Sequence, residues 1–120
     1  MGKEWTTKLY EGIGVDLVEL AAIRRARFPW RVAEYFLTPR EYKEAQNSSD
    51  LYQFIASRFA AKEAVIKAFP ADLSPKDFEI IKGGRKPEVR FIHKQHAGFR
   101  AFVSLSHSEH YVIGFAKVTS

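Results

Sequence analysis

The 120-residue chain contains no cysteine and no long apolar run. Without cysteine, nothing indicates a small secreted domain held together by disulfides. A membrane-spanning helix needs about 20 predominantly apolar residues, and no stretch approaches that length. The first residues, MGKEWTTKLYEG, lack the apolar segment of a secretory signal. These absences favour a soluble, cytoplasmic protein.

The composition is that of a folded protein. Hydrophobic residues make up 46% of the chain and charged residues 28%, values near the averages of globular domains. The length is typical of one domain, and no linker or internal repeat divides it. We therefore expect residues 1–120 to form a single domain.

The net charge is +5 and the isoelectric point is near 9.6. The positive charge is concentrated in two segments, IRRARFPWR and IKGGRKPEVR. A basic surface attracts nucleic acid, phosphorylated small molecules or an acidic protein. A small basic excess also serves solubility alone, so charge by itself does not identify a partner.

Local signals predict helices in the first half of the chain. Residues 9–17 have the composition of a strand, and VELAAIRRARF has short helical character. Thr38 is a suitable N-cap, followed by proline at the first helical position and by Glu41 completing a capping box. The main helix starts after Ser49 or Asp50 and stops at Pro70.

The second half of the chain reads as strands. The segments DFEIIKG, PEVRFIH, RAFVSLSHS and HYVIGFAKV follow one another, with turns at GGRK and HSEH. Helices followed by an antiparallel meander predict an α+β fold.

The long helix carries three charges near its apolar stripe. At about 100° per residue, Ile55, Phe59 and Ile66 lie on one face. Lys62 falls inside that face, while Glu63 and Lys67 flank it. Packing alone explains this pattern if Lys62 extends its stem over the core and Glu63 pairs with Lys67 at i,i+4.

Several familiar sites do not match. GIGVDLVEL places Asp16 at the end of an apolar strand, but Leu17 occupies the third glycine position of a dinucleotide fingerprint. Ser106, in SLSHSEH, lacks the glycine elbow of a serine hydrolase. The histidine pairs 93/96 and 107/110 lack the glutamate and cysteine partners that would indicate zinc.

The order of these segments resembles the holo-acyl-carrier-protein synthase family, the small phosphopantetheinyl transferases. The matching stretches are GIGVDLVEL, FLTPRE, SRFAAKEAVIKAF, FEI leading to GRKP, and VSLSHS followed by YVIGFA. They cover nearly the whole chain from Gly12 onward. Residues 1–8 form an extension beyond the match, with no assigned role.

The resemblance implies the 4'-phosphopantetheinyl transferase-like fold, in which a long central helix packs on an antiparallel sheet. It also implies a homotrimer with sites between subunits. The implied reaction moves 4'-phosphopantetheine from coenzyme A to a serine of apo acyl carrier protein, releasing adenosine 3',5'-bisphosphate. This places the enzyme in lipid metabolism, including fatty acid biosynthesis.

The resemblance also implies roles for individual residues. Asp16 and Glu63 match magnesium ligands and Lys67 matches the active-site lysine; all three are expected in catalysis, and Glu63, or a water it orients, is our candidate for the base. The coenzyme A contacts are expected at Arg58, Lys67, Pro87, His107 and Ser108. An acidic carrier protein is expected to dock on Arg24, Arg25, Arg27 and Arg31.

The chain departs from the family pattern at Pro70 and Ala71, where a glycine-bearing turn is usual. Two alternatives therefore stay open. One is a catalytically weak relative that binds coenzyme A or a carrier protein without turnover. The other is a nucleic-acid-binding module, for which Phe28 and Trp30 near arginines give a faint indication.

Overall fold

The computed structural model describes residues 9–120, so the proposed extension at residues 1–8 lies outside the described part. The helices are α1 (Leu20–Arg24), α2 (Pro29–Phe36), α3 (Pro39–Gln46) and α4 (Leu51–Ala68), with short 3-10 turns η2 (Pro75–Asp77) and η3 (Lys94–His96). The strands are β1 (Glu11–Glu19), β2 (Phe78–Gly83), β3 (Lys86–Phe91), β4 (Arg100–His107) and β5 (Tyr111–Thr119).

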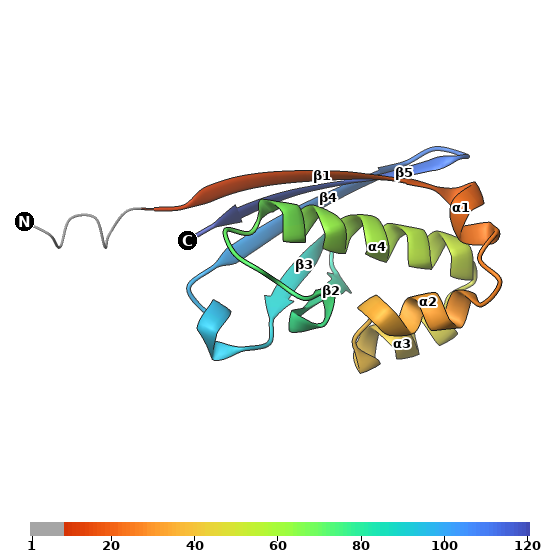
Figure 1. Cartoon of the computed structure of the whole chain (residues 1–120), viewed down its shortest axis with the longest axis horizontal. Helices are drawn as coiled ribbons and strands as arrows, with labels where there is room; N and C mark the ends of the chain where they lie inside the picture. Colours follow the sequence, from red (N-terminus) through yellow and green to blue (C-terminus); the bar gives the residue numbers. More distant parts are fainter. Residues whose placement is uncertain (1–8) are drawn as a thin grey trace, which may run out of the picture.

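The five strands form one antiparallel sheet in the order β1-β5-β4-β3-β2. The N-terminal strand therefore pairs with the C-terminal strand, and Asp16 lies directly opposite Gly114. Figure 1 shows α4 running along one face of the sheet, with α2 and α3 beyond it. This arrangement confirms the predicted α+β class, and α4 packs against β1 and β5.

Capping residues set the helix ends as predicted. The Thr38 hydroxyl accepts a hydrogen bond from the Glu41 backbone, and the Glu41 carboxylate accepts one from the Thr38 N–H. Asp50 caps α4 through the N–H of Gln53. Helix α2 was not predicted from the sequence; it begins with Pro29 at its first turn and has no side-chain N-cap. Without a capping side chain, its start carried little local signal.

The buried face of α4 differs from the prediction. Phe59 and Ile66 of the expected apolar stripe are only half-buried, and alanines form most of the contact with the sheet. The fully or nearly buried residues are Ile55, Ala56, Arg58, Ala60, Ala61, Lys62, Ala64, Val65 and Ala68. Small side chains allow the helix backbone to approach the strands closely, and a wheel that weights large apolar residues underrates such a face.

The face of the sheet opposite α4 is apolar and exposed. It carries Ile13, Val15 and Leu17 from β1 beside Ile113 and Phe115 from β5, each between 42% and 67% exposed. In the described part of the chain, the helices lie on the other face (Figure 1). None of the helices in residues 9–120 is long and apolar enough to cross a bilayer.

Candidate active site

Glycines allow α4 to lie directly against β1 and β5. A Cβ atom added at Gly12, Gly14 or Gly114 would come 2.1, 2.0 or 2.4 Å from the carbonyl oxygens of Ala68, Ala64 and Ala60, respectively. Those distances leave no room for a methyl group, so only glycine permits this approach. The helix backbone and the glycine-bearing strands are therefore in direct contact on either side of Asp16.

Asp16 on β1 meets Lys67 near the C-terminal end of α4. The Lys67 Nζ atom lies 3.0 Å from Asp16 Oδ1 and also donates a 3.0 Å hydrogen bond to the Val15 carbonyl. The Asp16 side chain is 14% exposed and that of Lys67 is 52% exposed. Lys67 therefore pairs with Asp16, across the strand–helix contact, and not with Glu63 as the packing-only interpretation assumed.

Glu63 lies one helical turn before Lys67, half-buried and within the electrostatic influence of Asp16. Burial raises the pKa of Glu63 above its ordinary value of 4.5, the Asp16 charge raises it further, and Lys67 partly offsets both. The folded protein thus holds this proton more tightly than the unfolded chain. Stability from this group is consequently lost as the pH rises from 4.5 through the raised pKa.

The two carboxylates fit a magnesium ion. Asp16 Oδ2 is buried and has no hydrogen-bond partner among residues 9–120, although buried carboxylate oxygens are normally paired. Magnesium binds one or two protein carboxylates and keeps several waters or phosphate oxygens. The described residues contain no cluster of three or more potential metal ligands. Asp16 and Glu63 would therefore hold such an ion with oxygen ligands from water and substrate.

Arg58, predicted to bind coenzyme A, lies inside an ion-pair network. Its Nη2 atom is 2.9 Å from Glu44 Oε2, its Nη1 atom is 3.9 Å from Glu41 Oε2, and its guanidinium stacks over Phe54. Only 6% of its side chain is exposed. A ligand contact by Arg58 would require part of this network to rearrange, and its role toward coenzyme A stays a prediction.

The other predicted contacts lie on β3 and at the β4–β5 turn. Pro87 is half-buried on β3, His107 is exposed at the end of β4, and Ser108 follows it. His107 pairs with Val112, which in turn pairs with Val18, two residues beyond Asp16 on β1. His107 is thus near the Asp16 end of the sheet, while Pro87 lies toward the opposite edge. Their roles also stay predictions.

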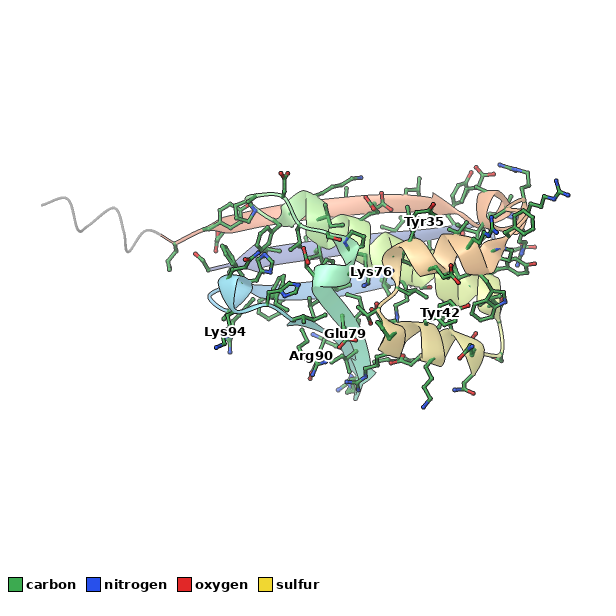
Figure 2. The ribbon with its side chains drawn as sticks, turned by 60° about the horizontal axis from the view of Figure 1, so that its bottom comes forward. Tyr35, Tyr42, Lys76, Glu79, Arg90 and Lys94 are labelled. Carbon is green, nitrogen blue, oxygen red and sulfur yellow. The ribbon has the colours of Figure 1, made fainter. Side chains whose placement is uncertain are left out.

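The predicted docking arginines run from the last residue of α1, through the connecting loop, into the first turn of α2. Arg24, Arg25, Arg27 and Arg31 are all exposed. The guanidinium groups of Arg27 and Arg31 both stack on the Phe28 ring, at 5.4 and 5.3 Å. An open hollow lined by Arg31, Glu34, Tyr35 and Lys76 continues this surface toward η2, and Figure 2 shows Tyr35 and Lys76 on the same side of the molecule. None of Asp16, Glu63 and Lys67 lines that hollow.

The ammonium group of Lys62 is buried. The packing interpretation instead expected the stem to cover the core and the ammonium to reach solvent. Its Nζ atom lies 2.6 Å from Glu41 Oε1 and donates to the carbonyls of Pro75 and Phe78 at 2.6 and 2.9 Å. Burial lowers the pKa of Lys62 below 10.5, against the opposing effect of Glu41. A buried ammonium is costly unless carboxylate or carbonyl oxygens pair with it, and three such oxygens surround Lys62 Nζ.

A second buried carboxylate, Glu79, was missed in the sequence. Burial opposes its ionisation, but hydrogen bonds from Thr38 and Arg90 outweigh that cost and hold the pKa of Glu79 below 4.5. Figure 2 shows Glu79 and Arg90 together on the neighbouring strands β2 and β3. An alternating strand pattern hides such a residue, because its partner Thr38, the N-cap of α3, lies 41 residues away.

Comparison with known proteins agrees with this arrangement. Residues 12–116 match the family model of the 4'-phosphopantetheinyl transferase superfamily. The holo-[acyl-carrier-protein] synthase of Chlorobium limicola is 37% identical over 116 residues, covering 89% of this chain and 92% of that protein.

Solved structures show the same likeness. The holo-[acyl-carrier-protein] synthase of Neisseria meningitidis has a TM-score of 0.80 at 31% identity, covering 89% of this chain and 96% of that one. The Bacillus anthracis synthase, solved in complex with CoA (3',5'-ADP), has a TM-score of 0.77 at 30% identity, with 91% and 96% covered. The chain belongs to the 4'-phosphopantetheinyl transferase superfamily and is an enzyme of the holo-[acyl-carrier-protein] synthase family.

Proposed function

We propose that this enzyme transfers 4'-phosphopantetheine from coenzyme A to a serine of an apo acyl carrier protein, in a magnesium-dependent reaction that releases adenosine 3',5'-bisphosphate. The observation that carries the proposal is the meeting of Asp16, Glu63 and Lys67 at the contact between β1 and α4. The coenzyme A complex of the Bacillus anthracis relative supports the choice of substrate.

The reaction requires a nucleophile, a proton acceptor and neutralisation of charge. The serine oxygen bonds to the phosphorus that carries pantetheine, while the bond from that phosphorus to the bridging oxygen breaks. The bonding electrons leave with the phosphate of adenosine 3',5'-bisphosphate, and the serine proton goes to Glu63 or to a water that Glu63 orients. Asp16 and Glu63 would hold the magnesium ion, which would supply positive charge to offset the negative charge of the diphosphate.

The side chains of this site suit these tasks. In the metal-free site, burial and the Asp16 charge raise the pKa of Glu63, so this carboxylate accepts a proton more readily than an ordinary glutamate. The Lys67 ammonium is half-exposed beside Asp16 and can contact an incoming phosphate oxygen. Preorganised positive charge at the transferring phosphoryl group is usually the dominant catalytic contribution.

We further propose that the carrier docks on Arg24, Arg25, Arg27 and Arg31. Carrier proteins are acidic, and an exposed cationic surface steers an acidic partner and speeds encounter. The stacking of Arg27 and Arg31 on Phe28 adds an apolar contact within the same surface. We also propose that the enzyme is cytoplasmic and consists of a single domain.

The exposed apolar sheet face supports self-association into the proposed homotrimer. Five apolar side chains from β1 and β5 lie side by side there, and exposed patches of this kind mark interaction surfaces. Light scattering of the wild-type chain should give three times the chain mass. Phe115→Glu, which puts a charge in the patch, should give a smaller species, whereas an unchanged mass would exclude this face as the interface.

Mass spectrometry of an apo carrier protein, incubated with coenzyme A and magnesium, tests the activity. A gain of one phosphopantetheine group is expected with the wild type, and its loss with folded Asp16→Asn and Glu63→Gln variants. Glu11→Gln, on the same strand but 70% exposed at the side chain, is the matched control and should remain active. Coenzyme A binding without any gain would instead identify the chain as a non-catalytic relative.

A further inference from the structure

The contact between α4 and the sheet is set by backbone atoms. The carbonyl oxygens of Ala60, Ala64 and Ala68 are spaced four residues apart and lie along one side of the helix. Each would meet a Cβ atom at one of three glycine positions on β1 and β5. At Gly114 the atoms in the way are the Ala60 oxygen at 2.4 Å, the Ala60 carbonyl carbon at 2.6 Å and the Ala61 nitrogen at 3.1 Å. Backbone atoms, unlike side chains, cannot rotate aside.

We propose that Gly114 is a positioning residue for the metal-binding carboxylates, because its lack of a side chain sets the gap between Asp16 and Glu63. The inference rests on the proposed function and goes beyond it. Asp16 is fixed to the sheet and Glu63 to the helix, so the separation of these elements determines whether one ion can contact both carboxylates.

The position of Gly114 makes it the residue best placed for this role. It is the direct cross-strand partner of Asp16. The carbonyl that it meets belongs to Ala60, which is three residues, or about one helical turn, before Glu63. A change in the contact at Gly114 therefore shifts the α4 segment that carries Glu63 relative to the part of the sheet that carries Asp16.

The expected displacement is large for a metal site. Real side-chain carbons essentially never approach other atoms within 3.0 Å, whereas a Cβ at residue 114 would lie 2.4 Å from the Ala60 oxygen. Gly114→Ala must therefore change the separation of β5 and α4 by roughly 0.6 Å or more to relieve this overlap. Functional groups generally have to be held within about 0.5 Å of their productive geometry.

Manganese titration of the full-length protein, followed by electron paramagnetic resonance without carrier or coenzyme A, tests the inference. Manganese serves as the spectroscopic probe of the magnesium site. Gly114→Ala is expected to weaken binding about tenfold, as do other changes that misplace metal ligands. Val118→Ala, a cavity variant in the buried end of β5, is the control for lost stability and should leave manganese affinity unchanged.

A compensating substitution separates positioning from general disruption. Asp16→Glu lengthens the carboxylate arm by one methylene, so it should weaken manganese binding in the wild-type background. In the Gly114→Ala background, where the gap is wider, the same change should strengthen binding. If Gly114→Ala acted only by lowering stability, Asp16→Glu would not weaken manganese binding in one background and strengthen it in the other.

Each outcome decides between the possibilities. Wild-type affinity in folded Gly114→Ala, or further weakening when Asp16→Glu is added to it, would overturn the positioning role. If Gly114→Ala does not fold, Asp16→Glu alone decides: weaker binding supports a gap fitted to aspartate, and equal or tighter binding refutes it. No manganese binding by the wild type would instead overturn the metal site of the proposed function.

Discussion

A Lys62→Met substitution would break the buried ion pair at the centre of α4. Its Nζ atom is surrounded by Glu41 Oε1 and by the carbonyl oxygens of Pro75 and Phe78, all within 2.9 Å. The Lys62 and Glu41 side chains are 1% and 0% exposed, so water cannot replace the lost ammonium. Methionine fills most of the same volume, and the cost therefore comes from electrostatics and not from a cavity.

The expected loss of unfolding free energy is about 4 kcal/mol, the usual cost of removing one partner from a buried ion pair. For a chain of this size, that corresponds to a fall in melting temperature of roughly 15 °C. The pair itself need not be strongly stabilising, because burial already lowers the pKa of Lys62. What destabilises the variant is a buried Glu41 carboxylate that keeps its backbone donors and the Arg58 guanidinium at 3.9 Å but loses the ammonium in direct contact, together with two carbonyls that lose their donor.

Urea denaturation followed by circular dichroism, at one fixed protein concentration, measures this effect. Lys43→Met is the matched control, because Lys43 is an exposed lysine on α3 and should change stability by no more than about 0.5 kcal/mol. Combining Lys62→Met with Glu41→Gln removes both charges, and the double variant should lose about 2 kcal/mol less than the sum of the single variants. Additive losses, or a Lys62→Met loss similar to that of Lys43→Met, would refute the reasoning.

Three further predictions address other parts of the molecule. In EDTA, which keeps metal ions away, Glu63→Gln should be slightly more stable than the wild type at pH 7, and its unfolding free energy should fall less between pH 4.5 and 7. If the unfolding free energies of the two proteins change equally with pH, the raised pKa is contradicted. Thr38→Val removes the N-cap of α3 and a hydrogen bond to Glu79, and chemical denaturation should show a loss of about 2 kcal/mol. Arg24→Gln should raise KM for the carrier protein about threefold at low salt without changing kcat, and a lowered kcat at unchanged KM would argue against docking there.

Local sequence was sufficient to predict most elements of the fold. Thr38 with Glu41, Asp50 and Pro70 are signals that act within a few residues, and the structure places the ends of α3 and α4 where these signals indicated. The four C-terminal strands were also predicted within a few residues of their observed bounds. Helix α2 was missed because its burial depends on α4, an element that begins 15 residues after α2 ends.

The sequence by itself determined which residues are available for chemistry and where the long helix begins and ends. Its motifs also led to the family that the comparisons confirmed. Tertiary structure alone decided that Lys67 would pair with Asp16, 51 residues away, and not with Glu63 on the same helix. It likewise decided that the Lys62 ammonium would be buried against Glu41. The physical reason is that ion pairing and burial depend on distances between elements far apart in the sequence. For Asp16 and Lys67 the distance is set by how closely the glycines and alanines allow β1 and α4 to approach, and for Lys62 and Glu41 it is set by the packing of α4 against α3.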